Sequence, residues 1–196
     1  MWDQRYAEPG FAYGTEPNDY LRERAARLPA GGRVLCLAAG EGRNAVFLAE
    51  QGHRVHAVDA SRVGLDKAEA LAAERGVEIS TEVADLARYA VEPASWDGVI
   101  SIFAHLPPPV RARIHREVVA GLRPGGVLIL EAYHPEQLAH GTGGPPTREM
   151  LYDLATLRDE LDGLALEEAR EVEREIVEGR FHTGRGAVVQ IVGVKP

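Results

Sequence analysis

Apolar and polar positions in residues 33–133 follow two alternating patterns. Short apolar runs are typical of strands covered on both faces, and apolar residues three and four positions apart are typical of helices. Strands are predicted at residues 33–39, 53–60, 77–85, 96–103 and 125–133. Helices are predicted between them at residues 42–52, 62–75 and 107–122. Strands that alternate with helices in this way predict βαβ units and a parallel sheet.

The last third of the chain departs from this alternation. Residues 134–146 are rich in glycine and proline and predict a loop long enough to act as a lid. An amphipathic helix is predicted at 148–163, followed by two long strands at 164–181 and 184–196. The tight connection between these strands predicts a hairpin, so the sheet should finish with an antiparallel strand.

The chain, residues 1–196, is predicted to be a single domain with three parts. Residues 1–30 form an aromatic-rich arm and a helix. Residues 31–133 form the cofactor-binding core. Residues 134–196 form the lid loop, a helix and the terminal hairpin.

The amino-acid composition limits the classes of molecule that such a domain can bind. The formal net charge is −8, so no nucleic-acid partner is expected, because binding to phosphates needs a cationic face. No apolar run reaches the roughly 18 residues of a membrane span, and the N-terminus lacks the apolar segment of a secretory signal. The single cysteine, Cys36, excludes an internal disulfide and a multi-cysteine zinc site. We predict a cytoplasmic monomer or homodimer that acts on a small molecule, with no membrane partner and no metal.

The turn after the first predicted strand carries the strongest chemical signal. Gly40, Gly42 and Ala45 match G-x-G-x-x-G/A, and Asp59 ends the next strand. This arrangement is typical of a nucleotide site with an acid for the ribose, although glycines at such a turn also serve backbone conformation alone. Asp85 ends the third strand. A ligand with a ribose and an adenine but no pyrophosphate suits these three strand ends better than a dinucleotide does.

Residues 34–45 read VLCLAAGEGRNA, which resembles the first motif of the Rossmann-like S-adenosylmethionine (SAM)-dependent methyltransferases. The resemblance implies an α/β fold, a three-layer αβα Rossmann-like sandwich with a mainly parallel seven-stranded sheet and an antiparallel last strand. The cofactor-binding residues that it implies are Ala38, Gly40, Gly42, Asn44, Asp59, Ala60, Asp85, Leu86 and Ser101. Two positions depart from the family motif, because Cys36 replaces its acid and Ala38 its first glycine. A methyl group at Ala38 fits if its φ is negative.

Within that family, the chain resembles the tellurite-resistance (TehB-type) and thiopurine-methyltransferase-like branch. The resemblance rests on WDQRY at 2–6, YGTEPNDYL at 13–21, FAHLPP at 103–108 and, more loosely, the hairpin sequence. In this branch the arm folds over the cofactor, which makes Tyr13 a covering residue. A hydrophobic contact that closes one end of the sheet is the alternative for Tyr13. The hairpin of the branch brings a histidine and an arginine over the substrate, which the resemblance assigns to His182 and Arg185.

SAM carries its own electrophile, so the protein mainly orients two reactants and excludes water. A soft anionic acceptor needs orientation, whereas a neutral thiol or hydroxyl needs a base such as histidine. His182 and Arg185 are the predicted catalytic residues, because a histidine and an arginine on one turn make a compact anion site; a solvated turn is the alternative. His105 and Tyr133 are the predicted substrate-binding residues.

The predicted function is SAM-dependent methyl transfer to a small-molecule acceptor, a chalcogen oxyanion or a thiol, by in-line displacement. An NAD(P)-linked oxidoreductase and a SAM-binding sensor without catalysis are the alternatives. Two charged segments are expected to face solvent: the helix face with Arg111, Arg113 and Arg116, and the partly exposed strand at residues 166–180.

Overall fold

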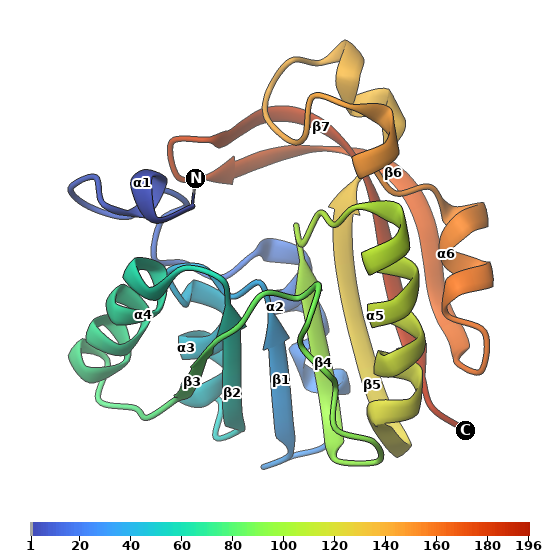
Figure 1. The fold of residues 1–196 in the computed structure, drawn as a ribbon, viewed down its shortest axis with the longest axis horizontal. Coiled ribbons are helices and arrows are strands. Elements are labelled where there is room, and N and C mark those ends of the chain that lie inside the picture. Colours follow the sequence, from blue (N-terminus) through green and yellow to red (C-terminus); the bar gives the residue numbers. More distant parts are fainter. Residues whose placement is uncertain (1) are drawn as a thin grey trace.

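The computed structural model describes residues 2–196, which form a seven-stranded sheet with helices on both faces (Figure 1). The strands are β1 (Arg33–Leu37), β2 (Arg54–Asp59), β3 (Ser80–Val83), β4 (Trp96–Ile102), β5 (Leu122–Tyr133), β6 (Ala165–Glu178) and β7 (His182–Val194). Their order is β3-β2-β1-β4-β5-β7-β6. Strands β1 to β5 pair in parallel, and β7 is antiparallel to both β5 and β6. The predicted Rossmann-like sheet is confirmed.

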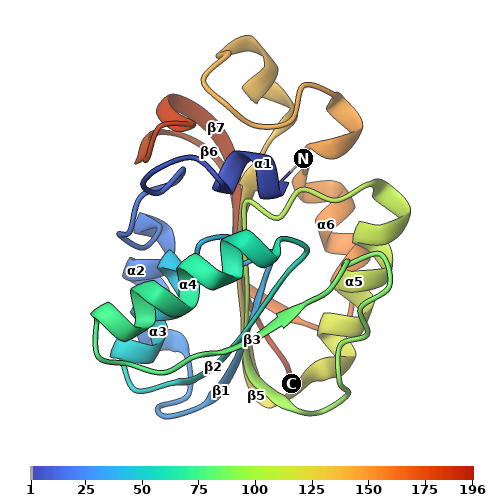
Figure 2. The ribbon, with the colours of Figure 1, turned by 60° about the vertical axis from the view of Figure 1, so that its left-hand side comes forward.

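The helices form two layers (Figure 2). One face of the sheet carries α2 (Asp19–Arg24), α3 (Arg43–Glu50) and α4 (Arg62–Glu74), and the other carries α5 (Pro108–Gly121) and α6 (Leu154–Glu160). Side chains of β1 alternate between the layers: Cys36 packs with α2 and α3, and Leu35 packs with α5. Both faces of β1 are therefore buried, which explains its continuous apolar run. Among residues 2–196, no helix is long and apolar enough to cross a membrane.

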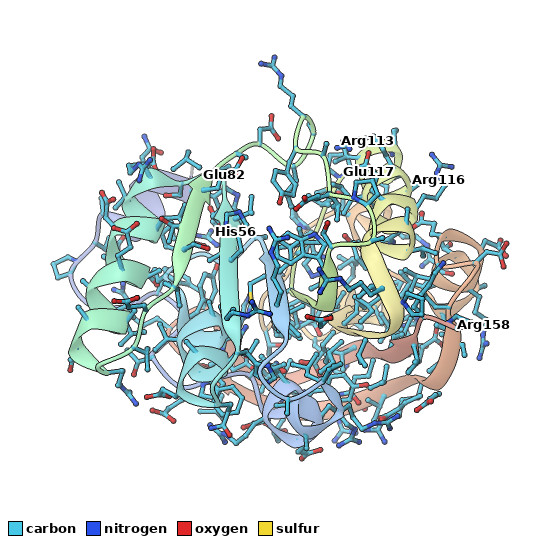
Figure 3. The ribbon with its side chains drawn as sticks, turned by 90° about the horizontal axis from the view of Figure 1, so that it is seen from below. His56, Glu82, Arg113, Arg116, Glu117 and Arg158 are labelled. Carbon is cyan, nitrogen blue, oxygen red and sulfur yellow. The ribbon has the colours of Figure 1, made fainter. Side chains whose placement is uncertain are left out.

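The connection between β3 and β4 is a loop, residues 84–95, rather than a helix. Side chains of α5 hold this loop (Figure 3). Arg113 donates to the carbonyls of Leu86 and Tyr89, and Glu117 accepts from the Val91 N–H at 3.1 Å. The expectation that Arg113 merely faces solvent is thus wrong, because its guanidinium reaches backbone oxygens that no helix satisfies.

Arg111 corrects the same expectation. It is 6% exposed and pairs with Glu160 of α6 at 3.0 Å, and His115 also contacts Glu160 at 2.7 Å. These contacts connect α5 to α6. A helix face with three arginines therefore includes one residue buried at a helix–helix contact.

The helix predicted at 148–163 is shorter than expected. Residues Arg148–Met150 form a 3₁₀ turn (η3), and α6 begins only at Leu154, where Asp153 Oδ1 accepts from the Thr156 N–H at 2.8 Å. Tyr152 lies between them, almost fully buried, and its hydroxyl contacts the backbone of residues 104 and 106. The free energy gained by burying Tyr152 exceeds that of continuing the predicted helix through this residue, so the helix does not form there. Two further 3₁₀ turns are η1 (Ala25–Arg27) and η2 (Pro135–Ala139), and the arm contains a short helix, α1 (Trp2–Tyr6).

Candidate active site

The turn between β1 and α3 holds its backbone in the left-handed region. Ala38 has φ +49°, Gly40 has φ +55° and Gly42 has φ +85°. The condition of a negative φ at Ala38 is not met: the turn keeps a glycine conformation, which costs an alanine roughly 1–2 kcal/mol. Cys36 is buried in β1, and burial raises the pKa of its thiol to about 12. Cys36 is therefore a packed strand residue rather than a nucleophile.

Asp59 ends β2 directly beside this turn. It is 6% exposed; Oδ2 accepts from the Gly40 N–H and Oδ1 from the Ser61 N–H, both at 2.8 Å. Burial raises the pKa of the carboxyl, and these N–H groups act in the opposite direction. Each carboxylate oxygen keeps a further lone pair. Asp59 can thus support the turn and still accept from two ribose hydroxyls.

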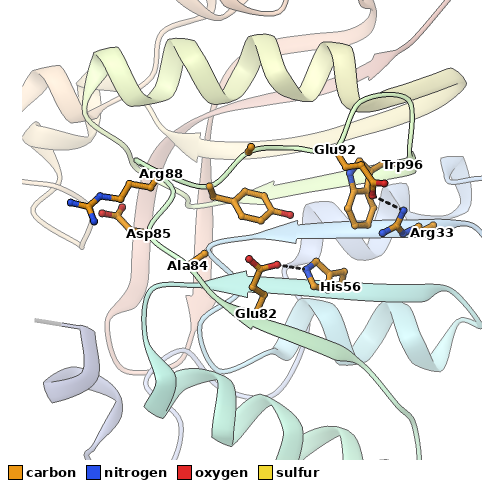
Figure 4. Close-up of a pocket in the computed structure, with 10 residues that line it drawn as sticks. Arg33, His56, Glu82, Ala84, Asp85, Arg88, Glu92 and Trp96 are labelled. Carbon is orange, nitrogen blue, oxygen red and sulfur yellow. Dashed lines mark hydrogen bonds and ion pairs between the residues drawn. The ribbon is translucent and has the colours of Figure 1, made fainter.

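Asp85 and Leu86 follow β3 at the same edge of the sheet. Leu86 is buried, whereas Asp85 is exposed and accepts from the Ala87 N–H at 2.8 Å. Asp85 lies at one end of a groove of about 660 Å³ that runs along the sheet past Trp96 to Arg33 (Figure 4). The groove follows the sheet face beside the 84–95 loop. Asp85 is therefore accessible to a ligand from this side.

The N-terminal arm crosses the carboxyl ends of the strands, above the glycine turn (Figure 1). Tyr6 is buried against this turn: a Cβ atom on Gly40 would lie 2.8 Å from the Tyr6 hydroxyl. The Ala12 N–H donates to Glu41 Oε2 at 2.6 Å, and the Ala12 carbonyl accepts from the Arg180 N–H at 2.9 Å. The arm thus connects the glycine turn to the tip of the β6–β7 hairpin.

Tyr13, Phe103, His105, Tyr133 and His182 form a group of rings that we call the aromatic cluster. His182 lies at its centre, with ring centroids 4.5 Å from Tyr13, 4.7 Å from Phe103 and 5.3 Å from Tyr133. His105 stacks on Tyr133 at 5.7 Å. Phe103 follows β4 with φ +51°, a strained conformation of the kind that concentrates at functional sites.

The two histidines of the cluster differ in whether their ring nitrogens have hydrogen-bond partners. His105 Nδ1 lies 2.9 Å from the Met150 carbonyl, and its Nε2 accepts from the Tyr133 N–H at 3.3 Å. His182 Nδ1 and the Tyr133 hydroxyl are buried without a partner anywhere in residues 2–196. Burial lowers the pKa of His105 to about 4 and that of His182 to about 3. Both imidazoles are neutral at pH 7, and only His182 has a nitrogen left for a ligand.

Comparison with known proteins relates this chain to methyltransferases. Residues 34–126 match a family model described as a methyltransferase domain. A relative from Mycobacteroides abscessus, 2-heptyl-1-hydroxyquinolin-4(1H)-one methyltransferase, is 26% identical over 166 residues, 80% of this chain and 73% of the relative. The fold is shared by a SAM-dependent methyltransferase from Mesorhizobium loti, at 22% identity and a TM-score of 0.68, with 89% of this chain and 96% of that chain covered.

Residues 34–126 form a methyltransferase domain, and the chain has the fold of SAM-dependent methyltransferases. The alternative function, an NAD(P)-linked oxidoreductase, is therefore rejected. TehB from Haemophilus influenzae also shares the fold, at 16% identity and a TM-score of 0.72, over 100% of this chain and 66% of that chain. It is one of several methyltransferases with this fold, so the TehB-type branch stays a prediction.

The residues predicted to bind SAM gather at the ends of β1 to β4, although several are engaged by the protein itself. A Cβ atom on Gly42 would collide with Ala68 of α4, so Gly42 permits close helix packing. Asn44 Oδ1 accepts from the Asn18 N–H of the arm at 2.9 Å. Ser101 is buried in β4, whereas Ala60 is exposed after β2.

Arg185 is the predicted catalytic residue that the structure does not bring to the cluster. Its exposed side chain donates to Glu173 of β6 at 2.5 Å and 2.8 Å. Strand β7 begins at His182, so residues three positions apart lie on opposite faces of the strand. Within residues 2–196 the methyltransferase contains no group of three or more His, Cys, Asp or Glu side chains that could hold a metal ion.

The sequence reasoning missed a set of paired side chains beside the site, which we call the buried ion network: Asn18, Arg43, Glu131, Arg174 and Glu178. Glu131 is fully buried and accepts from Arg174 at 2.7 Å and 2.9 Å and from Asn18 at 2.6 Å. Glu178 accepts from Arg174, Asn18 and Arg43. The network connects the hairpin of the methyltransferase to its arm and to the first turn of α3. A lone glutamate in the apolar run LILEAY was the available signal.

Proposed function

We propose that the methyltransferase acts on a small-molecule acceptor at the aromatic cluster, with SAM held at the ends of β1, β2 and β3. The observation that carries this proposal is the juxtaposition of the glycine turn, Asp59 and Asp85 along one edge of the sheet, next to the cluster. When bound, SAM supplies a methyl group on a sulfonium, which is electrophilic without help from the protein.

The cofactor residues would each hold a different part of SAM. Asp59 has two acceptor positions left for the ribose hydroxyls, and the exposed carboxylate of Asp85 can accept from an exocyclic amine. Leu86 offers an apolar surface for the adenine, and the turn from Ala38 to Gly42 offers backbone. Tyr13 lies between Tyr6 and His182, where it would cover the cofactor and help to exclude water.

The acceptor side of the site supports a small molecule. The M. abscessus relative is named for a hydroxyquinolone acceptor, a small planar molecule. His182 and Tyr133 present the free polar atoms, whereas His105 positions Tyr133 through its backbone. The chalcogen-oxyanion and thiol acceptors stay candidates of this proposal, as do a cytoplasmic location and a monomer or homodimer.

Calorimetric titration with S-adenosylhomocysteine tests the cofactor site. Asp59→Ala should raise the dissociation constant at least about tenfold, because a hydrogen bond to a charged group contributes roughly 1.5–3 kcal/mol. Asp66→Ala, at an exposed position on α4, is the matched control and should bind as the unmodified protein does. Asp85→Ala adds a variant at an exposed position that cannot fail through loss of a buried group. Unchanged affinity in both Asp59→Ala and Asp85→Ala would sink the assignment.

Transfer of a radiolabelled methyl group to thiols, phenols, selenite and tellurite separates catalysis from sensing. Product with any of these acceptors supports the proposal. Tight binding of S-adenosylhomocysteine with no product from the whole panel would favour the sensor alternative.

A further inference from the structure

Two polar atoms of the aromatic cluster are buried and unused. Tyr133 is fully buried at the end of β5, and neither its hydroxyl nor Nδ1 of His182 has a partner among the residues that the structure describes. The two rings are nearly perpendicular, at 86°, with centroids 5.3 Å apart. A buried polar group without a partner costs roughly 1–3 kcal/mol. Two such atoms on neighbouring rings therefore indicate a polar ligand atom between them.

The positively charged side chains around Tyr133 and His182 are already paired with other groups. Arg185 pairs with Glu173 and Arg43 with Glu178. Arg5 donates to the Tyr13 hydroxyl at 2.7 Å and is stacked on the rings of Trp2 and Phe181. In residues 2–196 no guanidinium or ammonium group donates to Tyr133 or His182, and His182 itself is neutral. An oxyanion with concentrated, strongly hydrated charge would meet no counter-charge at this pair.

The backbone of the lid loop lies close to Tyr133. A Cβ atom on Gly144 would lie 2.8 Å from the Tyr133 ring, and one on Gly143 would lie 3.4 Å from the Tyr133 hydroxyl. The peptide backbone of these glycines therefore lies directly against the ring. The Gln137 side chain holds the loop there through the Gly143 carbonyl at 3.1 Å. A ligand in that space would meet the rings of Phe103, Tyr133 and His182, whose centroids lie 4.6–5.3 Å apart, and such aromatic walls suit a planar ligand.

Resting on the proposed function, we infer that the acceptor is a planar aromatic molecule with an ionised oxygen or sulfur, bound against Tyr133 in the place of the Gly143–Gly144 backbone. The Tyr133 hydroxyl and an Nδ1–H of neutral His182 donate to the ionised atom. Ring delocalisation spreads its charge, so neutral donors and aromatic walls suffice. The phenol or thiol loses its proton to water before it binds.

The reaction balances without a base. The lone pair of the acceptor forms the bond to the methyl carbon as the sulfur–carbon bond breaks, and that electron pair stays on sulfur. One negative and one positive reactant give two products without net charge from the reaction. The role left to the chain is orientation of the ionised atom and exclusion of water.

Tyr133→Phe tests the inference with a matched control. Binding of thiophenol and of 4-nitrophenol to the protein saturated with S-adenosylhomocysteine should weaken about tenfold. The melting temperature should not fall, because phenylalanine removes a hydroxyl that has no partner. Tyr152→Phe removes a buried hydroxyl bonded to residues 104 and 106, and should lower the melting temperature by about 2–4 °C without changing acceptor affinity.

A comparison of acceptors completes the test. Methylation of thiophenol and 4-nitrophenol, with little of cyclohexanethiol, selenite or tellurite, is the expected result once each thiol's rate is divided by its ionised fraction. Preferred methylation of selenite or tellurite would overturn the inference and leave the proposed function standing. Aromatic methylation with equal acceptor affinity in Tyr133→Phe would overturn the placement. Binding of S-adenosylhomocysteine without any product would instead count against the proposed function.

Discussion

The buried ion network and the aromatic cluster lie at the same end of the hairpin, yet they satisfy their polar groups differently. In the network, Glu131 accepts from Asn18, Arg174 and Gln190, and Glu178 accepts from three donors. In the cluster, four residues along the chain from Glu178, His182 keeps an unused nitrogen. A complete network stabilises the arrangement of the elements, whereas the proposed acceptor site keeps polar atoms without a protein partner.

The largest effect should come from breaking the network. Glu178→Ala leaves the guanidinium groups of buried Arg43 and half-buried Arg174 with fewer partners, which costs about 3–5 kcal/mol in the free energy of unfolding. Urea unfolding followed by circular dichroism measures this loss.

Glu173→Ala is the matched control, because Glu173 lies on the same strand but pairs with exposed Arg185. Its expected loss is much smaller than that of Glu178→Ala, because water screens an exposed ion pair. Equal losses in Glu173→Ala and Glu178→Ala would show that the network contributes nothing beyond a surface ion pair.

The sequence was sufficient for the parts of the molecule that depend on local periodicity. The strands, their parallel pairing through βαβ units and the glycine turn follow from apolar runs and from spacing. Side-chain pairs between distant segments could not be predicted in this way. Glu131, for example, pairs with Arg174, which lies 43 residues away in the sequence. Even so, the two-residue repeat of β6 puts Arg174 and Glu178 on the same face as buried Ile176.

The candidate site was predictable to a similar extent. His182 and Tyr133 were named from position and resemblance, and the structure brings them together. Arg185 was paired with His182 on the assumption of a turn, whereas the strand starts at His182 and sends Arg185 outward. The left-handed φ of Ala38 and Phe103 depends on the whole turn rather than on residue type.

Mild acid should weaken the aromatic cluster before it weakens the network. Burial lowers the pKa of His105 to about 4 and of His182 to about 3, so between pH 6.5 and 4 the unfolded chain binds protons that the folded chain does not. Stability therefore falls as the pH falls through this window, by about 2 kcal/mol per histidine at pH 5. Glu178, whose pKa is lowered by Arg43 and Arg174 against the effect of burial, loses its contribution only below its unfolded pKa, near 4.3.

Urea midpoints at pH 7 and pH 5 measure this effect in the unmodified protein and in His182→Gln. The variant should lose about 2 kcal/mol less than the unmodified protein, which is the contribution of His182. Asp59, whose raised pKa changes stability in the opposite direction, contributes equally in both proteins. Its contribution therefore cancels when the two losses of stability are subtracted. A loss of the same size in both proteins would mean that His182 is not buried as a neutral group.

The smallest effect concerns the lid, and it distinguishes a loop that competes with the acceptor from one that only covers it. Gly144→Ala and Gly141→Ala both put alanine at a positive φ, +87° and +65°, which costs each about 1–2 kcal/mol. Only at Gly144 does the new methyl group meet Tyr133; at Gly141 nothing lies within 4 Å. Gly144→Ala should therefore lift the loop from the ring and speed acceptor association about threefold to fivefold over Gly141→Ala, a difference of roughly 0.7–1 kcal/mol. Stopped-flow mixing of 4-nitrophenol with the S-adenosylhomocysteine complex gives the two rates, and equal rates would mean that the acceptor does not take the place of the glycine backbone.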